Sequence, residues 1–231
     1  VLATSGIGLL GKRLGLDSYR SANQLVKLLG DVGSSFAGLD FEIDGAENLR
    51  RERPAIFVFN HQSLLDAMVL SHLLREDVVA LCKKEMANNP IVGPLLRQAD
   101  TIFVDRGEKD QVDVLKRARA VLASGRSLVI APEGTRSTLG DIQPFKHGAF
   151  FLARKAGVPI VPIILHNVKD ALPKGGMVVR PATIRVTVLD PVQPASIRSV
   201  RQACSELEER YVELLGKSAL AALPYDASAI A

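Results

Sequence analysis

Seven short apolar runs recur between residues 41 and 189, and they constrain the fold of this chain more than any other feature. Most of them are uninterrupted rather than alternating, which is typical of strands covered on both faces. The runs are FEI (41–43), AIFVF (55–59), VVALC (78–82), TIFV (101–104), SLVIA (127–131), PIVPIIL (159–165) and TIRVTVL (183–189). Helical patterns lie between several of them, at 64–75, 91–98, 109–124 and 147–156. This alternation predicts an α/β fold, a single domain with a largely parallel central sheet flanked by helices.

The two ends of the chain differ from this alternating middle. Residues 5–33 read as helical, with leucines separated by lysines and arginines, a pattern that fits a helix lying in a membrane interface. A helix packed against its own domain fits the same pattern equally well. A last amphipathic helix is expected at 196–216. We therefore divide the chain into an N-terminal amphipathic segment (1–37), an α/β domain (38–216) and a loose C-terminal tail (217–231).

Composition excludes several classes of protein. The chain has 231 residues, 47% of them hydrophobic, and a formal net charge of +4 without a block of five basic residues, so we expect no nucleic-acid partner. Two distant cysteines, Cys82 and Cys204, form neither a disulfide framework nor a metal quartet. No apolar run reaches the ~18 residues of a transmembrane helix, and no signal peptide is recognisable. Because the chain begins with Val1, we expect a processed form or a piece of a longer chain.

One motif near the start matches a cofactor-binding pattern but is interpreted as part of a helix. GIGLLG, at 6–11, matches the G-x-G-x-x-G pattern of dinucleotide-binding sites. Such a site needs a strand before the loop and an acidic residue about 20 positions later. Only VLATS precedes the motif, and the segment that follows reads as helical. We therefore interpret these glycines as part of an amphipathic helix.

The stretch VFNHQSLLDAMVL, at 58–70, carries the strongest chemical signal. It reads as a strand that passes into a helix, with Ser63 as the expected N-cap. His61 then lies at the carboxyl end of the strand, where open α/β sheets place their sites, and Asp66 lies in the first helical turn. A carboxylate that accepts one imidazole N–H fixes the tautomer and leaves the other nitrogen as a base. The alternatives are a structural histidine and an aspartate that stabilises the helix dipole.

Two further strand ends carry charged residues. Glu133 and Arg136 follow the strand SLVI in APEGTRS (131–137), and Arg106 follows another strand in TIFVDRG (101–107). An arginine suits a phosphate because it donates two parallel hydrogen bonds, although a weak Glu133–Arg136 surface pair is the alternative. The three strand ends look consecutive, so they predict a site for an anionic, phosphorylated substrate.

Four blocks, in order, resemble those of the glycerolipid acyltransferases. NHQSLLD is similar to the N-H-x4-D block, and IFVDR (102–106) resembles the second block. PEGTRS (132–137), followed by FKHGAF (145–150), resembles the third, and GVPIVPI (157–163) resembles the fourth. The resemblance covers roughly residues 38 to 190, and the blocks look most like those of bacterial lysophosphatidic acid acyltransferases.

This resemblance implies an O-acyltransferase that moves a fatty acyl group from acyl-CoA, or acyl carrier protein, to the free hydroxyl of lysophosphatidic acid. His61 would be the general base, oriented by Asp66, and the hydroxyl would attack the thioester directly. The substrate-binding residues implied are Arg106, Glu133, Gly134, Thr135, Arg136, Asn60, Lys83 and Lys146. Thioesters are already activated, so no metal and no cofactor are expected.

The resemblance also implies a place and partners. We expect a peripheral protein on the cytoplasmic face of an anionic membrane, with no transmembrane helix. Alternatives keep the chemistry but change the acceptor to glycerol-3-phosphate, another lysophospholipid or a glycolipid, or make the chain a non-catalytic membrane-binding module. A metal hydrolase built on His61, Asp66, His72 or His147 is disfavoured, because these residues show no ligand-like spacing.

Overall fold

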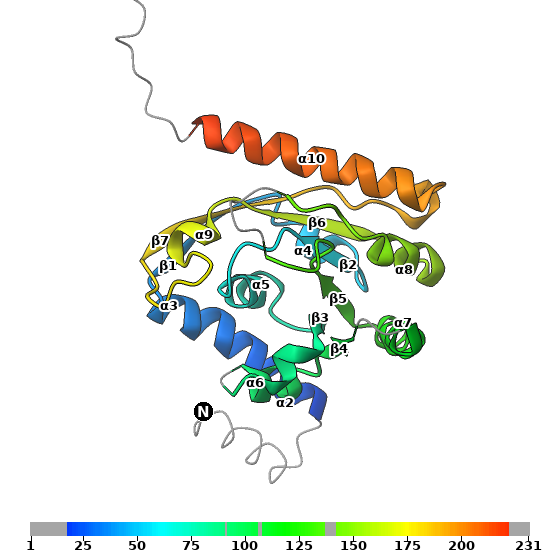
Figure 1. The fold of residues 1–231 in the computed structure, drawn as a ribbon, viewed down its shortest axis with the longest axis horizontal. Helices are drawn as coiled ribbons and strands as arrows, with labels where there is room; N and C mark the ends of the chain where they lie inside the picture. Colours follow the sequence, from blue (N-terminus) through cyan, green and yellow to red (C-terminus); the bar gives the residue numbers. More distant parts are fainter. Residues whose placement is uncertain (1–17, 91, 106–107, 137–141, 222–231) are drawn as a thin grey trace, which may run out of the picture.

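A computed structural model describes residues 18–221 except 91, 106–107 and 137–141. Its centre is a seven-stranded sheet in the order β1-β7-β6-β2-β5-β3-β4 (Figure 1). The strands are β1 (Leu39–Asp44), β2 (Ile56–Phe59), β3 (Val78–Lys83), β4 (Ile102–Val104), β5 (Ser127–Ile130), β6 (Ile160–Leu165) and β7 (Ala182–Val188). Only the β6–β7 pairing is antiparallel. The predicted α/β fold and its largely parallel sheet are therefore confirmed.

The longer helices also follow the predicted pattern. The four expected between strands are α5 (Asp66–Leu74), α6 (Gly93–Gln98), α7 (Glu108–Ala123) and α8 (Gly148–Ala156). The last helix, α10 (Val200–Ala221), begins later and ends later than the predicted 196–216. Four short helices were not predicted: α4 (Asn48–Arg51), η2 (Lys84–Asn88), α9 (Val168–Ala171) and η3 (Pro194–Ser196). Segments of three to five residues are too short to show a period of 3.6 residues.

Strand β2 explains why an uninterrupted apolar run was a reliable signal. Phe57 and Phe59 belong to a core shared with α5 and α9, whereas Ile56 and Val58 belong to a core shared with α7, α8 and α10. Each of these side chains is at most 8% exposed. Helices therefore cover both faces of the sheet, and every position of the strand is apolar.

The N-terminal helix is continuous through α2 (Ser18–Leu28), the π-helical turn η1 (Leu29–Gly33) and α3 (Ser34–Phe36). It lies against α5 so closely that a Cβ on Gly30 would be 2.5 Å from the backbone nitrogen of His72. The carboxylate of Asp31 accepts two hydrogen bonds from Arg75, both at 2.8 Å. This guanidinium holds the pKa of Asp31 below its ordinary value. The predicted helix is thus confirmed from residue 18, and residues 1–17, with the glycine motif, lie outside the described residues.

One side of this helix packs on its own domain, and another does not. Leu25 is buried against the domain, whereas Leu28, Val32 and Phe36 are 42%, 42% and 89% exposed. The described part of the helix therefore packs on its own domain, and the membrane-interface interpretation stays a prediction. Among all the described residues, no helix is both long and apolar enough to cross a membrane.

Candidate functional site

The turn between β2 and α5 brings His61 and Asp66 together. Nδ1 of His61 lies 2.6 Å from Oδ2 of Asp66, and the backbone N–H groups of Gln62 and Ser63 donate to the same oxygen at 2.8 and 3.0 Å. We assign the proton of this contact to Nδ1, because Oδ2 already acts as an acceptor towards two backbone N–H groups. The side chain of Asp66 is 1% exposed and that of His61 is 30% exposed. The predicted contact is confirmed, and Nε2 is left as the basic nitrogen of a partly exposed ring.

Ser63 does not have the capping role predicted for it. Helix α5 begins at Asp66, so Ser63 lies three residues before its first residue. Its hydroxyl accepts the N–H of Leu65 at 3.2 Å and donates to the carbonyl of Leu172 at 2.7 Å. Because Ser63 is also 1% exposed, it ties the turn between β2 and α5 to the residue after α9 and is not placed to act as a nucleophile.

Glu133 is bonded to the backbone on both sides of the site. Its Oε1 accepts the N–H of His61 at 2.7 Å, and its Oε2 accepts the N–H of Gln143 at 2.9 Å. The residue is 4% exposed. Burial raises the pKa of this carboxyl, and the two backbone N–H groups act in the opposite direction. The carboxylate therefore links the turn after β2 to the segment before α8.

Asn60 and Gln62 fasten the end of β2 to the end of β6. The amide of Asn60 donates to the carbonyl of Leu165 and accepts its N–H, both at 2.8 Å. Nε2 of Gln62 donates to the same carbonyl at 2.6 Å. Both side chains are at most 5% exposed. Gln62 was not predicted as a site residue, because its partner is a backbone group 103 positions away.

Lys146 lies over the turn that follows β5. Gly134 has a positive φ of 66°, which favours glycine, and a Cβ there would be 2.7 Å from Nζ of Lys146. The backbone N–H of Lys146 donates to the carbonyl of Pro132 at 2.9 Å. Thr135 is exposed and Arg136 is half-buried. The structure thus brings Lys146 to the turn that holds Gly134, Thr135 and Arg136.

The order of strand ends corrects one prediction. The strands β6, β2, β5, β3 and β4 are parallel, so their carboxyl ends share one edge of the sheet in that order. The prediction that the ends of β2, β5 and β4 are consecutive is wrong, because β3 lies between β5 and β4. Lys83, the last residue of β3, is in register with Val104 and occupies this intermediate place. Arg106 lies outside the described residues.

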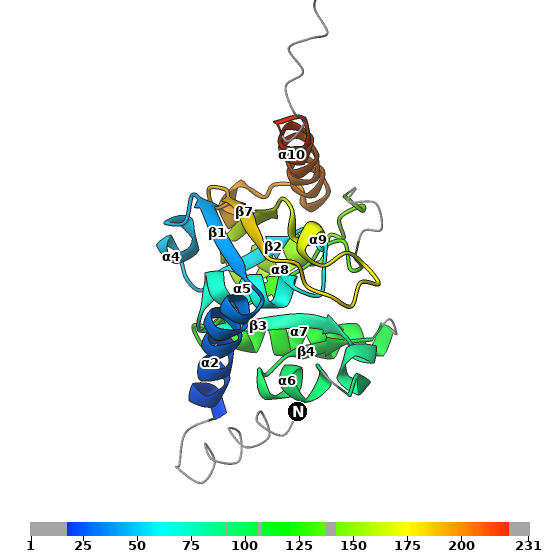
Figure 2. The same ribbon diagram turned by 90° about the vertical axis from the view of Figure 1, so that its left-hand side faces the viewer.

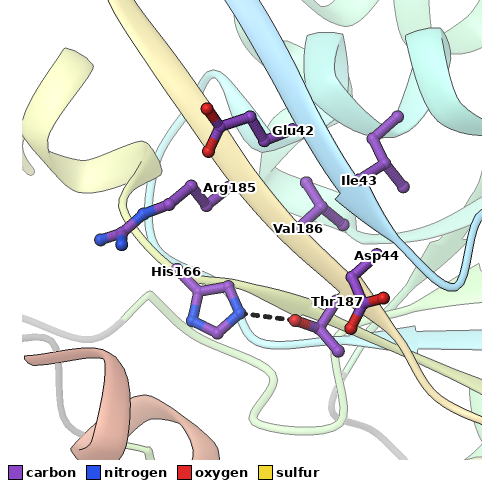
Figure 3. Close-up of a pocket in the computed structure, with 7 residues that line it drawn as sticks. All are labelled: Glu42, Ile43, Asp44, His166, Arg185, Val186 and Thr187. Atoms are coloured by element: carbon purple, nitrogen blue, oxygen red, sulfur yellow. Dashed lines mark hydrogen bonds between the residues drawn. The ribbon is translucent and has the colours of Figure 1, made fainter. Parts of the chain in front are cut away.

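A separate polar hollow lies over β1 and β7 (Figure 3). Glu42 and Asp44 face Arg185 and Thr187 there, and Nε2 of His166 lies 2.9 Å from the Thr187 hydroxyl. Burial, aided by the charge of Arg185, lowers the pKa of His166. None of the predicted site residues lines this hollow. The described residues also hold no group of three His, Cys, Asp or Glu side chains suited to a metal ion.

Comparisons with known proteins show the family of this chain. The sequence profile of the family described as Acyltransferase matches residues 40–166, more than half of the chain. The 1-acyl-sn-glycerol-3-phosphate acyltransferase of Saccharomyces cerevisiae is 34% identical over 165 residues, covering 69% of this chain and 54% of that protein. The beta form from Homo sapiens is 32% identical over 164 residues, covering 70% and 59%. The chain therefore spans roughly half to three fifths of the length of these curated relatives.

A solved structure extends the likeness to nearly the whole chain. The crystal structure of the 1-acyl-sn-glycerophosphate acyltransferase PlsC from Thermotoga maritima superimposes with a TM-score of 0.74 at 26% sequence identity. The match covers 93% of this chain and 92% of that one. The sheet and the helices that carry the site are thus shared with this bacterial protein.

Proposed function

Because this chain belongs to the acyltransferase family, we propose that it moves a fatty acyl group from an acyl thioester to the free hydroxyl of lysophosphatidic acid, giving phosphatidic acid. The names of its relatives in yeast, human and Thermotoga maritima support this acceptor. The observation that carries the proposal is the 2.6 Å contact between Nδ1 of His61 and Oδ2 of Asp66 at the carboxyl edge of the sheet.

The proposed reaction needs no protein nucleophile. Nε2 of His61 accepts the proton of the acceptor hydroxyl while its oxygen attacks the thioester carbonyl, and Asp66 stabilises the imidazolium. The tetrahedral intermediate then expels the thiolate, which takes the proton back from Nε2. General-base help is worth roughly 10²–10⁴ in rate, and positioning of the two substrates about 7–11 kcal/mol. The burial of Ser63 supports direct attack, because no exposed hydroxyl lies in this turn.

Glu133 and Asn60 are proposed to position the base. Sequence patterns assign both residues to substrate binding, and those contacts stay predictions. In the structure, the Glu133 carboxylate accepts the N–H of His61, and the Asn60 amide pairs with Leu165. Both therefore act on the substrate through the backbone that carries His61.

The phosphate of the acceptor is proposed to bind at the turn after β5. Arg136 supplies a bidentate donor, and Gly134 and Thr135 shape the turn around it. The ammonium of Lys146 over Gly134 supports this assignment, because it adds a positive charge to the same turn. Lys83 and Arg106 are proposed as further cations along the same edge of the sheet.

The donor and the place of action complete the proposal. Acyl-CoA or acyl carrier protein supplies the thioester, and no cofactor or metal is required. The protein acts as a peripheral protein on the cytoplasmic face of an anionic membrane, docked through residues 1–37. The exposed apolar side chains of Leu28, Val32 and Phe36 support this docking.

A thiol-release assay tests the proposal. Acyl-CoA is supplied with lysophosphatidic acid, with glycerol-3-phosphate or with no acceptor, and the same assay is run on His61→Ala. We expect release that requires lysophosphatidic acid and that falls about 10²–10⁴-fold in His61→Ala. His166→Gln is the matched control, because its ring contacts Thr187 rather than a carboxylate.

Each other outcome points to a named alternative. Release only with glycerol-3-phosphate changes the acceptor and keeps the chemistry. Turnover that survives in His61→Ala contradicts the role given to the base. No release with acyl-CoA or acyl carrier protein, for any acceptor, indicates a membrane-binding module that lacks the reaction.

A further inference from the structure

The loop between α9 and β7, residues 173–180, exposes two adjacent apolar side chains. Met177 is 96% exposed and Val178 is 76% exposed. Single exposed apolar residues are common on protein surfaces, but two neighbours that are almost entirely in water are not explained by packing. We call residues 173–180 the apolar loop.

The backbone of the apolar loop is fixed at its base and at its tip. The N–H of Arg180 donates to the carbonyl of Ala171 at 2.9 Å and closes the base. The N–H of Gly176 donates to the carbonyl of Pro173 at 2.9 Å and forms a turn at the tip. Val179 packs against the core beside α5. The loop therefore presents Met177 and Val178 to solvent from a supported backbone.

The apolar loop is tied to both turns of the candidate site. Leu172, the residue before the loop, accepts the hydrogen bond from the Ser63 hydroxyl at 2.7 Å. Nζ of Lys174 donates to the carbonyl of Arg136 at 3.4 Å. The exposed tip therefore belongs to the same local structure as the turn that carries His61 and the turn proposed to bind phosphate.

The N-terminal helix ends on the same side of the molecule. Figure 1 shows α3 and the apolar loop on the same side of the molecule, the side that faces the viewer in Figure 2, and Gly38 accepts the N–H of Ala182 at 3.1 Å just beyond them. Leu28, Val32 and Phe36 recur every four residues and so lie along one line of the helix. This line leads to Phe36, which is 89% exposed.

We infer that the apolar loop is a second contact with the lipid bilayer, in which Met177 and Val178 enter the interface and Lys174 and Arg180 meet anionic headgroups. Both basic residues are exposed and flank the apolar pair. Apolar side chains bordered by cations are suited to an anionic membrane surface. The inference rests on the proposed function in one respect, since a lipid acceptor must pass from the bilayer to His61.

The shape of this surface favours a bilayer over a protein partner. A stable protein interface takes about 800 Å² from each partner. The apolar surface here consists of one loop tip and the end of one helix. A bilayer needs no complementary shape, and a contact tied to the catalytic turn holds that turn at the lipid surface.

Vesicle binding of the whole chain tests the inference. The variant is Met177→Ser with Val178→Ser, and the matched control is Val112→Ser with Val212→Ser, two exposed valines on α7 and α10. Sedimentation is measured with phosphatidylcholine vesicles that contain phosphatidylglycerol. We expect the loop variant to bind about tenfold to a hundredfold more weakly, because two apolar side chains no longer enter the interface, and the control to bind as the unmodified chain does.

The activity assay separates this inference from the proposed function. With a short-chain lysophosphatidic acid below its micelle concentration, the loop variant should keep the activity of the unmodified chain, and with acceptor in vesicles it should lose activity in parallel with binding. Unchanged vesicle binding by the loop variant overturns the inference, as does weakened binding to acyl carrier protein with vesicle binding intact. If the unmodified chain releases no thiol in any assay, the proposed function fails, while the vesicle data still decide the role of the loop.

Discussion

Two histidines lie at the ends of neighbouring parallel strands, and only one of them has the surroundings of a base. His61 follows β2 and contacts the buried carboxylate of Asp66 at 2.6 Å. His166 follows β6 and contacts the hydroxyl of Thr187 at 2.9 Å. The pKa of His166 is lowered, first by burial and then by the charge of Arg185. A strand end is therefore not sufficient; a carboxylate on the second ring nitrogen distinguishes His61.

The largest effect is expected when this distinction is removed. Asp66→Asn keeps the shape of the side chain but loses the charge that stabilises the imidazolium, so we expect kcat to fall about 10²–10⁴-fold. The acceptor KM should change little. Thr187→Val, which removes the partner of His166, should leave kcat unchanged. The thiol-release assay measures both variants. Nearly full turnover in Asp66→Asn would contradict the idea that the contact with Asp66 is what makes His61, and not His166, the base.

A smaller effect is expected at the backbone of His61. In Glu133→Gln, the side-chain NH₂ group faces the backbone N–H of either His61 or Gln143. That N–H then lacks an acceptor, which lowers the free energy of unfolding by about 1–3 kcal/mol. We expect lower kcat with little change in acceptor KM, measured alongside urea unfolding. A raised acceptor KM with unchanged kcat would instead support direct contact between Glu133 and substrate.

The two strand ends share one distant support, the hydroxyl of Tyr211 on α10. Its single O–H proton is shared between the carbonyls of Val58 on β2 and Ile163 on β6, which lie 2.9 and 3.2 Å from the hydroxyl oxygen, and burial raises the pKa of Tyr211 well above its ordinary value. Tyr211→Phe should lower the free energy of unfolding by about 1 kcal/mol. Because the ring stays in place, kcat should remain near that of the unmodified chain. A large loss of turnover with unchanged stability would show that this bond positions His61 directly.

The smallest effect concerns the titration of His166. A histidine with a lowered pKa binds fewer protons in the folded state than in the unfolded state. The free energy of unfolding therefore decreases as pH falls from above the pKa of the unfolded state to below the pKa of the folded state. Burial and the charge of Arg185 oppose protonation, and the carboxylates of Glu42 and Asp44 line the same hollow. His166→Gln should therefore lose less stability on acidification, by a fraction of the ~1.4 kcal/mol that one pKa unit represents. If urea unfolding shows that the unmodified chain and His166→Gln lose the same free energy of unfolding on acidification, this distinction between the histidines does not hold.

Local patterns were sufficient where a single element decides the outcome. The apolar runs predicted every strand of the described sheet: strands covered on both faces, such as β2, are apolar throughout, whereas β1 and β7 alternate. The five-residue spacing predicted that Asp66 turns back to His61, since both lie in one short turn. Ser63 was misjudged because the turn extends to Leu65 before α5 begins. The short helices escaped prediction because they contain too few residues to establish a period.

Long-range contacts required the tertiary structure. The place of β3 between β5 and β4 depends on pairing between distant strands, and no local pattern specifies it. The same holds for the bond from Glu133 to the N–H of His61, and for the pairing of Asn60 with Leu165, 105 positions away. A sequence shows which side chains are present in a turn. Because nearly every residue carries the same backbone N–H and carbonyl groups, the sequence does not show which of these groups a side chain will contact. The amino-acid sequence thus determined the strands and the His61–Asp66 pair, whereas the packing of strands and loops decided the order of the sheet and what holds that pair in place.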